Sequence, residues 1–64
     1  MAVIEICKWI KSLNPTIRIN RDKNGSELWF GSKKMILNKE CPYAYNAVKH
    51  FDADFYDECI ILYV

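Results

Sequence analysis

The chain has 64 residues, 52% of them hydrophobic, and nine Lys or Arg against eight Asp or Glu give a net charge of +1. This length allows one domain near the lower size limit for a core without metals or disulfides, and the near-neutral charge excludes a field of one sign that would draw the whole molecule to nucleic acid or an anionic membrane. So high a hydrophobic fraction in so small a body predicts that some apolar surface meets a partner.

The cysteines and the N-terminus bear on the compartment. Cys7, Cys41 and Cys59 form no CxxC pair, and an odd number of widely spaced cysteines favours a reducing environment. The N-terminus lacks a basic leader, and no run approaches the roughly 18 to 20 apolar residues that span a bilayer. We therefore expect a single domain over residues 1–64, cytoplasmic and without membrane association.

Apolar residues recur at helical spacing at the start of the chain. Trp9 lies on the flank of this stripe, Ile4 falls on the polar side, and Asn14 followed by Pro15 provides a stop signal. The spacing predicts one amphipathic helix of about 12 residues. Its stripe is formed by Val3, Ile6, Cys7, Ile10 and Leu13.

The stretch from Thr16 to Ile36 changes to a period of two and contains Asn24-Gly25, the dipeptide that best fits a tight hairpin turn. A two-residue loop would place Ile17, Ile19, Leu28 and Phe30 on one face and turn Trp29 the other way. A three-residue loop with a bulge at Gly25 would instead place Trp29 with the two isoleucines. We favour the first register because it aligns four apolar side chains.

The segment from Pro42 to Ala53 has two interpretations. Its spacing suits a helix starting at Pro42, but it also suits one turn over 42–46 followed by a strand over 47–53. We favour the turn and strand, which would form a second hairpin with the C-terminal strand over 59–64. That last run is apolar on both faces and belongs inside the sheet.

The predicted fold class is α+β, with one N-terminal amphipathic helix packed on a three- to four-stranded, mostly antiparallel sheet. Such a helix covers one face of the sheet only. The other face would expose Trp29, Ile61 and Tyr63, with Arg18 at its edge, and a contiguous apolar patch of that kind predicts self-association or binding of a protein. Tyr43 is either a core residue or an anchor in this interface.

Acidic residues are concentrated near the end of the chain. Asp52, Asp54, Asp57 and Glu58 lack the glycine and glutamate positions of an EF-hand, so they predict a solvated loop or a binding patch for a protein or small ligand rather than a metal site. His50 and the three cysteines have no spacing that supports thiol catalysis or zinc. We therefore predict no catalytic residue, cofactor or metal.

Basic residues near the hairpin favour a second hypothesis. Trp29 lies among them in the sequence, and basic plus aromatic side chains are typical of single-strand nucleic-acid binders. Lysines on a hairpin also protect an edge strand from aggregation, and the net charge weighs against nucleic acid. A nucleic-acid-binding module is therefore the alternative. Its residues would be Trp29, Arg18, Arg21, Lys33 and Lys34.

The order of short motifs along the chain carries a resemblance. An IKxLNP helix end, an Ile-x-Ile strand, a Lys-Asn-Gly turn, Leu-Trp-Phe-Gly, Cys-Pro-Tyr and a terminal Ile-Ile-Leu-Tyr-Val strand follow one another, with matching points at Ile6, Leu13, Gly31 and 60–64. In this the chain resembles small uncharacterised phage and mobile-element proteins of low-GC bacteria. The resemblance implies a non-enzymatic protein that acts by binding, for example as an inhibitor or sequestering agent against a host defence system.

Overall fold

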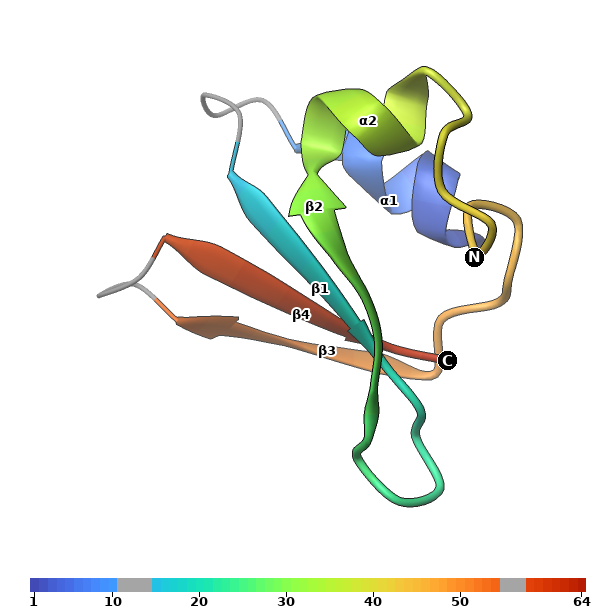
Figure 1. Ribbon diagram of the computed structural model, residues 1–64, viewed down its shortest axis with the longest axis vertical. Coiled ribbons are helices and arrows are strands. Elements are labelled where there is room, and N and C mark those ends of the chain that lie inside the picture. Colours follow the sequence, from blue (N-terminus) through green and yellow to red (C-terminus); the bar gives the residue numbers. More distant parts are fainter. Residues whose placement is uncertain (11–14, 55–57) are drawn as a thin grey trace.

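The computed structural model describes residues 1–10, 15–54 and 58–64. Both helices gather at one side of a four-stranded sheet (Figure 1). The α+β class and the N-terminal helix are as predicted, and a second short helix is added. The elements are α1 (Val3–Trp9), β1 (Thr16–Asn20), β2 (Glu27–Ser32), α2 (Lys33–Leu37), β3 (His50–Asp54) and β4 (Cys59–Tyr63).

The sheet has the strand order β2-β1-β4-β3. The inner strands β1 and β4 run parallel, while β2 pairs with β1 and β3 pairs with β4 in antiparallel fashion. The predicted central position of the C-terminal strand is confirmed. Strands β2 and β3 form the two edges.

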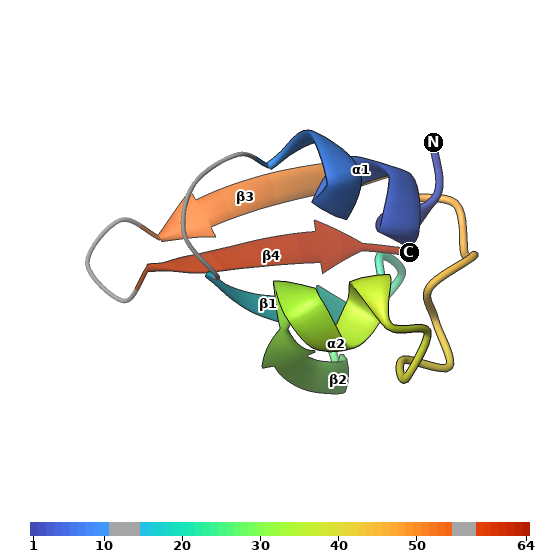
Figure 2. The ribbon, with the colours of Figure 1, turned by 90° about the horizontal axis from the view of Figure 1, so that it is seen from above.

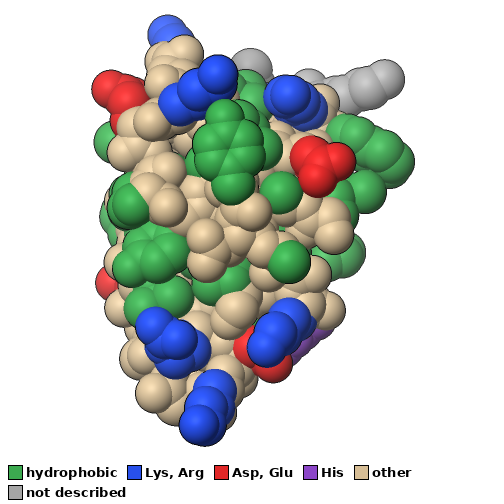
Figure 3. Space-filling view, turned by 90° about the vertical axis from the view of Figure 1, so that its right-hand side faces the viewer, with side chains coloured by type: hydrophobic (Ala, Val, Ile, Leu, Met, Phe, Trp, Pro, Cys, Tyr) green, Lys and Arg blue, Asp and Glu red, His purple; other side chains and the backbone are tan. Residues whose placement is uncertain are grey.

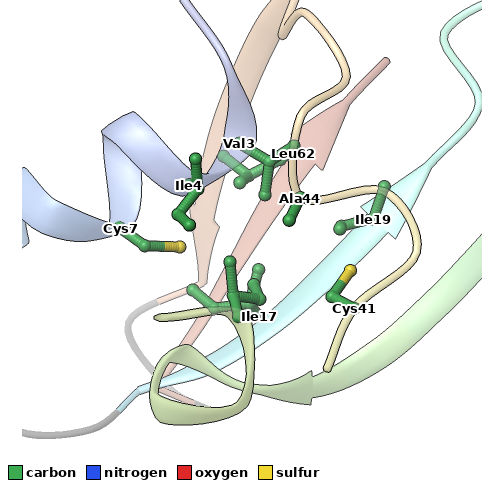
Figure 4. Packing of buried hydrophobic residues seen from close by; sticks show 9 residues of the cluster. Val3, Ile4, Cys7, Ile17, Ile19, Cys41, Ala44 and Leu62 are labelled. Carbon is green, nitrogen blue, oxygen red and sulfur yellow. The ribbon is translucent and has the colours of Figure 1, made fainter. Parts of the chain in front are cut away.

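The core lies between the two helices and one face of the sheet (Figure 4). Alternate residues of β1 point into it, and Ile17 and Ile19 are fully buried. Their neighbours across the parallel pair, Ile60 and Leu62, extend the same face into β4. The remaining buried members are Val3, Ile4, Cys7, Ile36, Cys41 and Ala44.

Helix α1 is shorter and more enclosed than predicted. It has seven residues, and Ile10 already takes an extended conformation with φ −74° and ψ 110°. Ile4, expected on the polar side, is only 6% exposed. The segment over residues 44–46 covers the start of this helix. The Ile4 N–H donates to the carbonyl of Ala44 (2.8 Å), and the Val3 N–H donates to the carbonyl of Asn46 (3.0 Å). These bonds pair two amide groups that have no partner within the first turn of a helix. The predicted helix residues Leu13 and Asn14 lie outside the described ranges.

The predicted hairpin forms, but the favoured register is wrong. Ile19 lies opposite Trp29 and Arg18 opposite Phe30, so Trp29 shares the helix-side face while Phe30 is on the far face. The register shifts between Ile19 and Asn20, where Leu28 is the extra residue of β2. The larger indole takes the place on the covered face, and the ring of Phe30 contacts the Arg18 guanidinium at 5.4 Å.

The turn of this hairpin spans residues 22–25 rather than two residues. The Gly25 N–H donates to the Arg21 carbonyl (2.7 Å), and the Arg21 N–H donates to Ser26 (2.8 Å). Gly25 has φ +73°, a region that glycine enters without steric cost. The Asn24 side chain supports the turn by accepting from the Ser26 N–H at 3.0 Å. The Asn-Gly signal thus marked the turn correctly but not its length.

The ambiguous segment adopts the favoured interpretation. Residues 42–46 form turns, and β3 follows as a strand antiparallel to β4. The strand begins at His50 rather than at Ala47. Ala47 instead makes an isolated bridge with Ala2, which ties this segment to the N-terminus.

Candidate protein-binding surface

An apolar groove of about 680 Å³ separates α1 from the edge strand β3. Figure 2 shows α1 above β3, with α2 beside β1 and β2. We call this feature the α1–β3 groove. Its lining residues are Met1, Ile6, Trp9, Ile10, Val48, Lys49, His50, Phe51, Ala53 and Ile60.

Three large and exposed apolar side chains line the groove. Trp9 is 72% exposed, Phe51 67% and Met1 56%, although each is of a type that is usually at least half-buried. Trp9 ends α1 and Phe51 lies in β3, so the two rings stand on the two walls. Partly buried Ile6 and Ile60 pack between them against the core. Aromatic anchors around a concave apolar surface are typical of protein-binding sites.

The short length of α1 explains why this groove stays open. The helix ends at Trp9, and the backbone is extended at Ile10, whose carbonyl accepts from Lys33 Nζ at 3.0 Å. Among the helices and strands, α1 packs mainly against α2. One wall of the groove therefore keeps its apolar side chains without a covering element among the described residues.

Strand β3 forms the other wall and is exposed along most of its length. Residues 50–53 are exposed and Asp54 is partly buried. The Asp52 carboxylate accepts from the N–H of its neighbour Ala53 at 2.9 Å. The groove therefore runs beside a sheet edge whose backbone groups face outward.

The observed register places the residues of the predicted binding face on both faces of the sheet. Arg18, Ile61 and Tyr63 do lie on the face away from the helices, all partly buried. Trp29 does not join them, because it packs on the core side. The large exposed residue of that far face is Phe30 at 56%, which occupies the place predicted for Trp29.

Arg18 is held in place on the far face by two contacts. Its Nε lies 2.8 Å from Glu27 Oε1, and its guanidinium stacks over Phe30. The buried Nε makes no hydrogen bond among the described residues, so the Glu27 contact is electrostatic rather than directional. Arg18 and Phe30 also line a shallow depression of about 230 Å³ with Thr16, Asp54, Cys59 and Ile61.

The other predicted residues lie apart from one another. Tyr43 is partly buried against the core, while Tyr45 is 67% exposed. Asp52 and Asp54 belong to β3 and not to a loop. Asp57 lies outside the described residues, and the described ones contain no cluster of three potential metal ligands.

His50 is a site residue that sequence reasoning missed. Its ring stacks on Tyr63, with centroids 4.2 Å apart and an interplanar angle of 12°, and its Nδ1 lies 2.9 Å from Asp22 Oδ1. These contacts hold the His50 ring beside Tyr63, on the face of the sheet away from the helices. The pairing depends on the strand register, and no local sequence signal could have indicated it.

The basic residues of the alternative hypothesis do not share a surface with Trp29. Arg18 is on the far face, whereas Trp29 is on the helix-side face. Lys33 Nζ donates to the Ile10 carbonyl. The basic-plus-aromatic platform predicted from the sequence is therefore not assembled by these residues.

Two thiols have shifted ionisation, and both lie in the core. Burial raises the pKa of Cys7 to about 11, with a further increase from nearby Cys41 and a small opposing effect of Lys33. Burial also raises the pKa of Cys41, although the Tyr43 N–H, 3.4 Å from its Sγ, acts in the opposite direction. A raised pKa keeps a thiol in its unreactive form.

Hydrophobic side chains also reach the surface between groups of Lys and Arg on the side where segment 40–49 lies (Figure 3).

No protein-family model matches the chain. No curated protein and no solved structure shows significant similarity to it. Among the described residues, no helix is long and apolar enough to cross a membrane.

Proposed function

We propose that the protein is a non-enzymatic interaction module that binds an extended segment of a partner protein in the α1–β3 groove. The observation that carries this proposal is the pair of exposed rings, Trp9 and Phe51, on the two walls of an apolar groove. The groove runs beside an exposed sheet edge. Such an edge accepts a further strand through backbone hydrogen bonds, while adjacent pockets take alternate side chains of the added strand.

The chemistry of the groove agrees with protein binding. Eight of its ten lining residues are apolar, and Lys49 and His50 are the polar ones. An apolar centre with a few polar groups at its rim is the usual composition of an interface. The groups with raised pKa, Cys7 and Cys41, are core residues outside the lining, so they supply no nucleophile to it.

The resemblance to phage proteins extends this proposal to the partner. A host defence protein bound in this way would be inhibited if the bound segment belongs to its active form. Nucleic-acid binding is the alternative proposal, and it predicts oligonucleotide affinity that falls steeply with salt concentration. Absence of oligonucleotide binding at low salt would exclude it.

The proposed function is tested by selecting random extended peptides for binding to the folded protein and mapping the bound peptides by NMR chemical-shift changes. We expect the changes to centre on Trp9, Phe51 and their neighbours. Trp9→Ala and Phe51→Ser should each weaken binding about 10-fold or more, as expected for aromatic anchors.

Phe30→Ser is the matched control, because Phe30 is a similarly exposed ring on the opposite face of the sheet. This variant should bind the selected peptides as the parent chain does. Peptides that map to the far face, or that are as sensitive to Phe30→Ser as to Phe51→Ser, would contradict the proposal.

A further inference from the structure

We infer that the groove and edge of β3 bind a second copy of this chain, through antiparallel pairing of the two β3 strands about a twofold axis at Phe51. This inference rests on the proposed function, since it names the partner of the same surface. It joins two four-stranded sheets into one continuous eight-stranded sheet. The argument comes from the exposed edge, the strand register and the charges along β3.

The backbone of β4 indicates which groups of β3 face the open edge. The Val64 N–H donates to Asn20 (2.9 Å) and the Glu58 carbonyl accepts from Thr16 (3.2 Å), so even-numbered residues of β4 face β1. Its odd-numbered residues then face β3, where they lie opposite His50, Asp52 and Asp54. Because N–H and C=O of one residue point to the same edge in an antiparallel pair, Phe51 and Ala53 present theirs to the open edge.

The Ala53 N–H agrees with this direction. It is bound by the Asp52 carboxylate of the same strand at 2.9 Å rather than by β4. The Asp52 side chain thus accepts the hydrogen bond that a neighbouring strand would otherwise accept from this outward N–H. When a second strand supplies a backbone carbonyl, the Asp52 carboxylate is released for another partner.

Only registers that keep each side chain on its own face of the sheet are possible, and each of the five described residues of β3 can then lie on the twofold axis. Centring on Ala53 places Asp52 of each copy opposite Asp54 of the other, and centring on Asp54 places two carboxylates opposite each other. Centring on His50 places the two imidazoles against each other. Centring on Asp52 places two carboxylates directly opposite, in the closely spaced type of pair. Like charges in that position are destabilising.

Centring on Phe51 gives a complementary pair on each side of the axis. The two Phe51 residues exchange backbone hydrogen bonds, and His50 of each copy lies opposite Asp52 of the other. These flanking pairs are of the closely spaced type, and imidazole opposite carboxylate is favourable. His50 is already positioned for this role by its stacking on Tyr63 and its contact with Asp22.

The same register covers the exposed apolar surface. Phe51 points to the face of the sheet that carries the groove, since it pairs with buried Leu62. The two Phe51 rings therefore meet between two grooves related by the twofold axis, with a Trp9 on each outer wall. Isologous pairing of this kind closes on itself and leaves β2 as the edge at each end.

The oligomeric state of the full chain is measured by sedimentation velocity from micromolar to millimolar concentration. We expect a reversible dimer, with the dissociation constant raised about 10-fold or more by Phe51→Glu, because this change puts two carboxylates on the axis. Phe30→Glu, at a similarly exposed ring on the far face, should leave the dimer unchanged. Far-UV circular dichroism verifies that both variants are folded.

Oxidative cross-linking of variants with one added exposed cysteine determines the register. The native Cys7, Cys41 and Cys59 are buried. Phe51→Cys should form disulfide-linked dimers, whereas His50→Cys and Asp52→Cys should form several-fold fewer, because their counterparts lie diagonally across the axis. Cross-linking that is strongest at position 50 or 52, or equal at all three, would overturn the inference.

The outcome also separates this inference from the proposed function. A chain that stays monomeric at millimolar concentration overturns the dimer, and the peptide selection still decides the groove independently. If both are correct, selected peptides should dissociate the dimer, since they occupy the same edge. A dimer that persists in saturating peptide would contradict the shared site.

Discussion

The indole of Trp29 lies across Gly31 on the helix-side face of β2. A Cβ atom added at Gly31 would lie 2.7 Å from Cζ2 of that indole, well inside van der Waals contact. The missing side chain therefore makes the space in which the ring packs. This relationship explains why the tryptophan faces inward, beside Ile19, while Phe30 faces outward.

Gly31→Ala should displace the indole and destabilise the fold. We expect a loss of about 1 to 3 kcal/mol in the free energy of unfolding, the usual effect of an added methyl group in a packed site, with a red shift of the Trp29 emission. Urea unfolding in a Trp9→Phe background isolates the signal of Trp29. In a double-mutant cycle with Trp29→Leu, followed by far-UV circular dichroism because the tryptophan is removed, the cost of the added methyl should largely disappear. Additive effects of the two changes would contradict this account.

The sequence predicted those parts of the fold that rest on strong local patterns. The run from Cys59 to Tyr63 is apolar on both faces, and a strand of that composition is stable only between two others, which is where β4 lies. The strand was favoured over a helix for β3 because the acidic residues over 52–58 suggested a loop between two paired strands, and the structure places Asp52 and Asp54 within β3 itself. The position of β4 depends on hydrophobic burial, which composition alone can indicate.

The hairpin register was not predictable in this way, because it depends on contacts between residues far from the turn. Counting from Asn24-Gly25 gave a two-residue loop, but the four-residue turn and the extra residue Leu28 shift the strands. Packing of Trp29 over Gly31 and of Phe30 on Arg18 compensates for the irregularity. None of these contacts has a local sequence pattern.

The candidate groove was missed because it is produced by tertiary structure. Its walls come from α1 and β3, which are separated by about two thirds of the chain. Their spacing is set by segment 44–48, which binds the start of α1 through the carbonyls of Ala44 and Asn46. Trp9 was placed on the flank of the helix, but nothing in the sequence placed Phe51 opposite it.

Gly25→Ala should cost about 1 kcal/mol, because the residue has φ +73° and a Cβ atom is disfavoured in that region. No heavy atom lies within 4 Å of an added Cβ, so the cost is one of backbone conformation alone. Gly25→Asn should cost less, since asparagine enters this region more readily. Thermal unfolding of the two variants tests the order, and an equal or greater loss for Asn would contradict it.

Ser32→Ala should weaken α2 by about 0.5 to 2 kcal/mol, the usual effect of losing an N-cap. The Ser32 hydroxyl accepts from the Met35 N–H at 3.2 Å at the start of this five-residue helix. The loss should appear as faster amide exchange around buried Ile36, measured by NMR. Ser32→Asp retains a capping oxygen and serves as the control. Equally fast exchange in both variants would show that the loss comes from Ser32 as the last residue of β2 and not from its capping of α2.

Cys7 should make stability fall in alkaline solution. Burial raises the pKa of this thiol in the folded chain from its ordinary value of 9.0 to about 11, so the unfolded chain loses this proton first as the pH rises. The contribution of the buried neutral thiol is therefore complete below pH 9 and is lost between about pH 9 and pH 11, by about 3 kcal/mol in total. The measurement is the difference in unfolding free energy between the parent chain and Cys7→Ala across this range, which removes titrations common to both. This difference should shrink with rising pH, and a constant difference would show that the Cys7 thiol ionises equally in the folded and unfolded chains.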